Sequence, residues 1–351
     1  MATALRRSVA DGADGPLRLP EPYLLFLGDT AEPSFGKTAL GLADWAGDRC
    51  VGELALDGCG FTTGLPPMTV SEARAAGARA LVIGVANQGG VIGAAWIPTL
   101  VAAMAAGLDI VSGLHARLAD VPALAEAARL HGRRLIDVRT PPAEIPVATG
   151  RKRSGKRLLT VGTDCALGKK YTALALHRAF TARGLDADFR ATGQTGILIA
   201  GGGMPMDAVV SDFEAGAAEM LSPDASPGHW DVIEGQGSLF NPAYAAVSLG
   251  LLHGSQPDVF VVCHDPSRTM LLGFDGYAMP AIEEVIDMTI ALGRRTNPAI
   301  RCGGISLNTS RYDTAAADAL LAHESERLGL PAADPIRGGE RFDTLVASCL
   351  A

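Results

Sequence analysis

Residues 157–170 read RLLTVGTDCALGKK, and this stretch decides the fold of the C-terminal half. Its apolar start suits a buried strand, its glycine-bounded centre suits a tight turn, and a helical pattern follows over 169–183. Backbone N–H groups in such a turn can surround an anion at the positive end of the helix, while a lysine reaches the outer phosphates. Strand, glycine turn and helix in this order therefore predict a phosphate-binding loop.

The loop departs from a nucleotide-hydrolysing P-loop in two ways. Five residues, not four, separate Gly162 from Gly168, and Lys170 stands where such enzymes have a Ser or Thr that binds Mg²⁺. Losing that ligand and gaining a cation favours a diphosphate that is held by charge and not cleaved, as in coenzyme A. The basic run at 151–157, otherwise a solvated linker, could reach a further phosphate. Thr172 and Glu234 remain alternative ligands for a metal.

A second segment supports the same kind of site. Residues 230–238, WDVIEGQGS, are predicted to form a strand that ends in an acid and a glycine-rich turn. A carboxylate at the carboxyl end of a strand beside a phosphate loop can hold Mg²⁺ or accept a proton. Both this segment and the long loop, with Thr163 and Asp164 after its first glycine, resemble those of dethiobiotin synthetase and its relatives.

Apolar strands alternate with helical patterns through the whole chain, which is typical of parallel sheets covered by helices. A proline-rich stretch at 140–146 divides the pattern. We therefore predict an α/β protein with a Rossmann-like N-terminal domain, 1–150, and a P-loop NTPase-like C-terminal domain, 151–351, with a mainly parallel sheet. Strands are expected at 22–28, 79–85, 108–114, 133–139, 157–163, 186–192, 229–235, 258–264 and 301–308.

Composition excludes several classes of function. The net charge of −8 and the aromatic content of 5% argue against nucleic acid as a partner. The first 15 residues, MATALRRSVADGADG, have no apolar run of the secretory type, and no apolar run suits a membrane span. The cysteines show no zinc-binding spacing. We expect a cytoplasmic enzyme without a metal, acting on a small molecule and compatible with a homo-oligomer.

The order of several longer blocks resembles the DgcN family of D-glutamate N-acetyltransferases over about residues 22 to 345. The blocks that carry the resemblance are LVIGVANQGG (81–90), GLDIVSGLH (107–115), VGTDCALGKK (161–170), ATGQTGI (191–197), SDFEAGAAE (211–219), EGQGSLFNPAY (234–244), LGLLHGSQPD (249–258) and GISLNTS (304–310). The resemblance implies a Rossmann-like domain followed by a P-loop domain. It also implies transfer of an acetyl group from acetyl-CoA to the amine of D-glutamate or a similar amino acid.

Acetyl transfer requires a base, because the substrate ammonium must lose a proton before its nitrogen attacks the thioester. We expect Glu234 or Asp212 in this role, with His264 as the next candidate. The coenzyme is expected to bind Gly162, Thr163, Asp164, Cys165, Ala166, Leu167, Gly168, Lys169, Lys170, Tyr171 and Thr172, with Asn308 near the adenine or forming a turn.

The amino-acid substrate needs polar and positive partners of its own. Arg190 and Arg268 are expected to bind its carboxylates, because guanidinium matches a carboxylate with two parallel hydrogen bonds; surface ion pairs are the alternative. Polar residues near predicted strand ends are expected to converge on the same ligand, namely Gln194, Thr195, Gln236 and Ser238. His253 is either a further ligand or a helix-end histidine that bonds to the chain.

Two other functions compete with acetyl transfer. A ligase or kinase of the dethiobiotin synthetase type would depend on ATP and Mg²⁺, and would have to accommodate Lys170. A non-catalytic nucleotide-binding protein would bind its ligand tightly without turnover.

Overall fold

The computed structural model describes residues 16–351 and divides into two compact units. One unit contains the chain up to Pro142 together with Gln194–Ala208, and the other contains Ala143–Gly193 and Val209–Ala351. The segment 194–208, which the sequence led us to place in the C-terminal domain, thus folds with the N-terminal unit. The stretch MATALRRSVADGADG lies outside the described residues.

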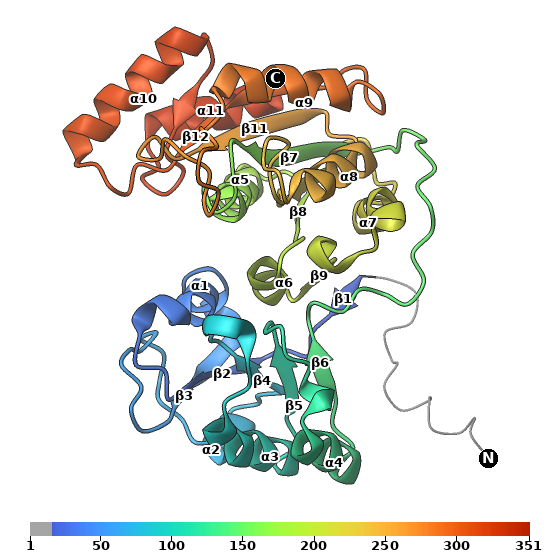
Figure 1. The fold of residues 1–351 in the computed structure, drawn as a ribbon, viewed down its shortest axis with the longest axis vertical. Helices are drawn as coiled ribbons and strands as arrows, with labels where there is room; N and C mark the ends of the chain where they lie inside the picture. Colours follow the sequence, from blue (N-terminus) through green and yellow to red (C-terminus); the bar gives the residue numbers. More distant parts are fainter. Residues whose placement is uncertain (1–15) are drawn as a thin grey trace. The chain divides into compact units, whose positions relative to one another are not determined.

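The N-terminal unit is built on a parallel sheet in the strand order β3-β2-β4-β5-β6 (Figure 1). Its buried strands are nearly continuous apolar runs, as expected for a parallel sheet covered on both faces. Its main elements are β2 (Tyr23–Gly28), α1 (Lys37–Ala46), β3 (Cys50–Ala55), α2 (Val70–Ala75), β4 (Ala80–Ile83), α3 (Ile97–Ala105), β5 (Asp109–Ser112), α4 (Pro122–His131) and β6 (Leu135–Asp137). This is the Rossmann-like arrangement that the sequence predicts.

Three further elements complete this unit, and two of them come from the distant segment 194–208. Strand β1 (Leu17–Arg18) pairs antiparallel with β9 (Gly202–Gly203), and helix α6 (Gln194–Ala200) contacts α1. The core of the unit packs around Phe26 and Trp96, whose rings meet edge to face at 5.7 Å. None of β1, β3, α2, α6 or β9 was predicted from the sequence.

The C-terminal unit contains a parallel sheet in the order β13-β12-β11-β7-β10-β8. Its strands are β7 (Lys156–Gly162), β8 (Ala187–Arg190), β10 (Trp230–Ile233), β11 (Val259–His264), β12 (Arg301–Leu307) and β13 (Ala332–Ala333). Its helices are α5 (Lys169–Ala182), α7 (Glu214–Leu221), α8 (Ala245–Ser255), α9 (Ile282–Gly293), α10 (Thr314–Leu328) and α11 (Glu340–Leu350). No helix in the described part of the chain has the length and apolar character to cross a bilayer.

The connections of this sheet place a crevice beside β7. Helices α5 and α11 share one apolar cluster on one face, while α8 and α9 contact each other and pack on β7 and β11. The crossovers after β7 and after β11 run in opposite directions along the sheet, so the right-handed rule puts α5 and α9 on opposite faces. Ligands of open α/β sheets bind at such a switch point, outside the carboxyl ends of the strands.

All nine strands that we predicted are present, most of them shortened by one to four residues. In this unit the sequence analysis missed α7, α8, α11 and β13. Helix α8 carries leucine, glycine and serine around most of its circumference, so it lacks the polar stripe that marks a surface helix.

Candidate functional site

The loop between β7 and α5 has the backbone of an anion-binding turn. Gly168 occupies the N-cap position of α5 with φ +108°, a conformation that favours glycine. Because Gly168 has no side chain to cap the helix, the first backbone N–H groups of α5 stay available to an anion. The second glycine turn, at Gly235, lies against β7, and a Cβ there would come within 1.7 Å of the carbonyl oxygen of Thr160.

Both lysines of the loop are held close to it. Lys169 is 7% exposed, and its Nζ donates a hydrogen bond of 2.7 Å to the carbonyl oxygen of Asp164. Lys170 is half-buried with Nζ 4.3 Å from the ring centre of Tyr171. Burial lowers the pKa of both ammonium groups, and nearby carboxylates including Glu234 oppose that effect. Two poorly hydrated cations at one helix N-terminus form a strongly attractive environment for a diphosphate.

Asp164 anchors the loop from inside. Its carboxylate is fully buried and accepts hydrogen bonds from Asn241 Nδ2 at 2.8 Å, from the backbone N–H of Leu272 at 2.7 Å and from the guanidinium of Arg268. Burial alone would raise the pKa of Asp164, but these donors outweigh it and hold the pKa below its usual range. Arg268 also donates to the carbonyl oxygen of Cys165 at 2.9 Å. The guanidinium that we expected on a substrate carboxylate is therefore bound to the loop itself.

Glu234 lies at the end of β10 and is only 4% exposed. Its Oε2 accepts hydrogen bonds from the backbone N–H groups of Thr192 at 2.9 Å and Gly193 at 3.1 Å. Burial raises the pKa of Glu234 above its ordinary value, against the opposing effect of those donors and of Lys170 and Lys169. A raised pKa makes the Glu234 carboxylate a stronger base, which favours a role in accepting a proton.

His264, at the end of β11, lies on the other side of the loop. Its Nδ1 is 3.0 Å from Thr163 Oγ1, and Ser238 Oγ donates to the carbonyl oxygen of Thr163 at 3.1 Å. Burial lowers the pKa of His264, so the imidazole is neutral at neutral pH. Asn308 follows β12, where its backbone N–H donates to the carbonyl oxygen of His264 and its Oδ1 accepts from Ser310. The carboxyl ends of neighbouring strands thus bring these side chains to one edge of the sheet.

Several expected ligands have other partners. Arg190 forms ion pairs with Asp231 at 2.6 Å and Asp188 at 3.0 Å, and His253 Nε2 lies 3.2 Å from the carbonyl oxygen of Leu292. His253 is therefore bound within the chain, as the alternative to a ligand role anticipated. Arg190 is also bound within the chain, but its partner Asp231 is buried, so this is not the surface ion pair that the sequence analysis offered as the alternative.

Three other expected site residues form no hydrogen bond or ion pair with the loop within residues 16–351. Asp212 is exposed in the turn Ser211–Phe213. Gln194 and Thr195, expected near a strand end, begin helix α6 and belong to the N-terminal unit, where Thr195 Oγ1 is 3.5 Å from Thr38 Oγ1.

The sequence analysis missed the residues that hold the site in shape. Asn241 Nδ2 donates a hydrogen bond to the carboxylate of Asp164. Thr192 Oγ1 accepts a hydrogen bond from Gln236 Nε2 at 3.0 Å and donates one to the carbonyl oxygen of Glu234 at 2.8 Å. Nothing in the local sequence marks Asn241 or Thr192, because their partners are 42 or more positions away along the chain. Thr172, one of the residues that we expected at the coenzyme, is buried, and its Oγ1 lies 2.8 Å from Ser306 Oγ.

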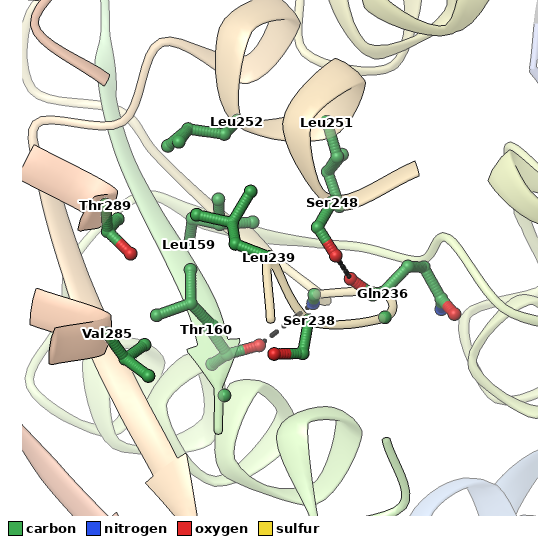
Figure 2. A pocket seen from close by; sticks show the side chains of 14 residues that line it. Leu159, Thr160, Gln236, Ser238, Leu239, Ser248, Leu251, Leu252, Val285 and Thr289 are labelled. Atoms are coloured by element: carbon green, nitrogen blue, oxygen red, sulfur yellow. Dashed lines mark hydrogen bonds between the residues drawn. The ribbon is translucent and has the colours of Figure 1, made fainter. Parts of the chain in front are cut away.

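A small cavity lies behind the loop, between β7, the turn 235–239 and helices α8 and α9 (Figure 2). Its walls include Leu159, Leu251 and Val285, and Ser248 Oγ donates to the carbonyl oxygen of Gln236 at 2.7 Å. The cavity measures about 20 Å³, which is room for about one water and not for a coenzyme. Within residues 16–351 the buried Thr289 Oγ1 has no hydrogen-bond partner, so a water is the occupant that this cavity suits.

One cluster within residues 16–351 has the make-up of a metal site, namely Asp188, His229 and Asp231. Arg190 already pairs with both of its carboxylates, which compensates part of their charge. The cluster lies on the paired bodies of β8 and β10, not at the carboxyl edge that carries the loop.

The fold and the site together define a protein with a Rossmann-like domain and a P-loop domain whose loop carries a lysine in place of a magnesium ligand. Residues 146–346 match the family model described as "Domain of unknown function (DUF1611_C) P-loop domain", and residues 49–141 match "Domain of unknown function (DUF1611_N) Rossmann-like domain". The chain belongs to the DUF1611 family.

Relatives support this assignment over almost the whole length. The chain is 51% identical over 328 residues to a protein of Tritonibacter scottomollicae, which covers 93% of this chain and 98% of that protein. It is 47% identical over 332 residues to a protein of Pseudoalteromonas sp, and the match covers 95% of this chain and 99% of that protein. Both relatives are named D-glutamate N-acetyltransferase. A crystal structure of a DUF1611 family protein from Anabaena variabilis aligns with a TM-score of 0.78 at 34% identity, over 95% of this chain and 99% of that one.

Proposed function

We propose that the protein is an N-acetyltransferase that moves an acetyl group from acetyl-CoA to the amine of D-glutamate. The observation that carries the assignment is the 47–51% identity, over more than nine tenths of the chain, to two relatives named for that activity. The geometry of the loop supports acetyl-CoA as the donor, because its paired lysines suit a diphosphate that is bound and not cleaved.

The coenzyme diphosphate binds at the N-terminus of α5. Lys169 and Lys170 supply the positive charge, and the N–H groups after Gly168 supply donors. Asp164 faces inward and is bonded to Arg268, Asn241 and Leu272, so it shapes the loop and adds no free negative charge on the anion side.

The reaction needs one proton to leave the substrate before the acyl group moves. Glu234 takes a proton from the substrate ammonium, because burial has raised its pKa towards the working range. The free amine nitrogen then attacks the thioester carbon, a C–N bond forms, the C–S bond breaks, and the second amine proton ends on the departing thiolate. His264, neutral and bonded to Thr163, is the alternative proton acceptor.

The test is an assay with acetyl-CoA and D-glutamate, free of metal and of ATP, that follows release of the coenzyme thiol and formation of N-acetyl-D-glutamate. We expect stoichiometric thiol and product. Hydrolysis of ATP with Mg²⁺ and D-glutamate, together with no thiol release, would instead establish a ligase or kinase. Tight binding of acetyl-CoA or nucleotide without either reaction would establish a binding protein.

A further inference from the structure

A second concentration of positive charge lies in the N-terminal unit. A hollow of about 450 Å³ opens at the amino ends of β4, β5 and β6. Its size falls within the range of small-molecule sites. It is lined by Arg18, Leu19, Pro20, Arg74, Arg79, Gly107, Asp109, Arg133 and Arg134.

The fold brings these arginines together along one edge of the sheet. Arg79 directly precedes β4 and Arg134 directly precedes β6, while Asp109 begins β5 between them. The backbone N–H of Asp109 donates to the carbonyl oxygen of Arg79 at 3.0 Å, which fixes these neighbours in register. Figure 1 shows β4, β5 and β6 next to one another in the sheet of the N-terminal unit. The parallel strands therefore place Arg79 and Arg134 on either side of Asp109 at one edge of the sheet.

Arg74 and Arg18 approach the same hollow from other elements. A Cβ on Gly107 would come within 3.4 Å of the Nε of Arg74, so this guanidinium lies close over the turn before β5. Arg18 lies in β1.

The protein neutralises little of this charge. In the part of the chain that the structure describes, Asp109 is the one acidic side chain that lines the hollow, and both of its oxygens accept hydrogen bonds from Arg134, at 2.9 and 2.8 Å. Arg133 donates to the carbonyl oxygens of Gly107 and His131, neither of which carries a formal charge. The guanidinium groups of Arg18 and Arg79 have no hydrogen-bond or ion-pair partner within residues 16–351. Like charges gathered in one concave surface repel each other until an anion binds between them.

We infer that this hollow is a binding site for a small anion that carries two or more phosphate groups. Guanidinium groups match phosphate oxygens with paired hydrogen bonds, and five arginines with one carboxylate suit a ligand with more than two negative charges. Among residues 16–351 no aromatic side chain lines the hollow, so recognition rests on the phosphates and not on stacking with a base. The inference concerns the N-terminal unit and does not depend on the transfer reaction.

The experiment is calorimetric titration of the full-length protein with inorganic diphosphate, with ADP and with citrate at low ionic strength. The double variant Arg18→Ala/Arg79→Ala removes the two unpaired guanidiniums, and we expect it to weaken diphosphate binding at this site at least about tenfold. Arg79→Lys should retain more affinity than Arg79→Ala. The matched control is Arg129→Ala, which removes an exposed arginine of α4 that pairs with Glu126 and does not line the hollow.

The P-loop is the competing diphosphate site, so the titration is repeated on Lys169→Ala and, if that variant does not fold, on Lys170→Ala. Binding that persists in the lysine variants and is lost in Arg18→Ala/Arg79→Ala locates the anion in the hollow. Unchanged affinity in the arginine variant overturns the inference. Citrate binding as tight as diphosphate binding overturns the assignment to phosphates, and ADP binding no tighter than diphosphate shows that only the phosphates are recognised.

Discussion

The ammonium of Lys169 donates a hydrogen bond of 2.7 Å to the carbonyl oxygen of Asp164, five residues earlier in the same loop. The side chain of that aspartate is itself bonded to Arg268, Asn241 and Leu272. The carbonyl oxygen of Asp164 thus positions the Lys169 ammonium, while the side-chain hydrogen bonds of Asp164 hold that residue in place. A ligand anion at the helix N-terminus meets a preformed charge, and the chain need not be reordered to bind it.

Removing this ammonium should weaken coenzyme binding. Lys169→Ala is expected to raise the dissociation constant for coenzyme A at least about tenfold, because a charge-assisted hydrogen bond is lost. Calorimetric titration measures the change. Arg341→Ala, at an exposed position of α11, is the control for loss of one positive charge and should bind as the unaltered protein does. Equal affinity of Lys169→Ala would remove the loop from coenzyme binding.

Glu234→Gln should lower turnover far more than coenzyme affinity. The amide keeps the shape and can still accept from the N–H groups of Thr192 and Gly193, but it cannot take up a proton. We expect kcat to fall about 100-fold or more, with an unchanged KM for acetyl-CoA. In the unaltered enzyme kcat should fall as pH drops below the raised pKa of Glu234. This decrease of kcat on the acidic side of the pH profile should be absent in the variant. A normal kcat in Glu234→Gln would transfer the role to His264.

The ion pair of Asp164 and Arg268 should contribute strongly to stability. Asp164→Ala leaves the guanidinium without its carboxylate, which we expect to cost about 3 kcal/mol of unfolding free energy, measured by urea denaturation. Since the pKa of Asp164 is lowered in the folded state, its contribution is present above the unfolded pKa and is lost as pH falls through the folded pKa. The difference between the variant and the unaltered protein should therefore shrink in acid. A constant difference down to low pH would contradict the role of the charge.

The cluster around His229 predicts the opposite dependence on pH. Burial lowers the pKa of His229, but its hydrogen bonds to Asp186 and Asp231 outweigh burial and raise the pKa above its ordinary value. The stabilising contribution of the imidazolium is then complete below the unfolded pKa and disappears as pH rises through the folded pKa. His229→Gln should cost roughly 1–2 kcal/mol at about pH 6 and less at about pH 8.5. The exposed His323 provides the control, because His323→Gln should change stability little at either pH.

Gly235→Ala tests the close packing of the two glycine turns. The added methyl would lie 1.7 Å from the carbonyl oxygen of Thr160, so strand β7 or the turn must move. We expect a loss of about 1–3 kcal/mol, together with reduced activity, because the displaced strand leads into the loop. At Gly228 a Cβ meets nothing within 4 Å, so Gly228→Ala should leave the thermal midpoint almost unchanged. Equal midpoints for the two variants would show that the turn is free to relax.

The phosphate loop and most strands of both sheets could be predicted from the sequence because they are local. A glycine turn between an apolar run and a helix can be recognised from consecutive residues alone. Strand β3, with the sequence CVGELA, was missed because Gly52 and Glu53 interrupt its apolar pattern, although both are buried. The buried Glu53 is explained only by its bonds to Thr62 and Thr63.

The partners of charged residues could not be predicted in the same way. The sequence does not distinguish an arginine at a strand end that binds a ligand from one that pairs with an acidic residue of the chain. In the structure Arg190 forms an ion pair with Asp231, and Arg268 forms one with Asp164. These pairs are 41 and 104 positions apart, so only the assembled sheet reveals them.

The membership of residues 194–208 in the N-terminal unit constrains how the gene can be cut or recombined. An N-terminal fragment that stopped at the proline-rich stretch would lack β9, the strand to which β1 is paired, and α6, which contacts α1. The complementary C-terminal fragment would carry that same segment without the body on which it folds. A cut at the proline-rich stretch therefore separates segments that belong to one folded unit.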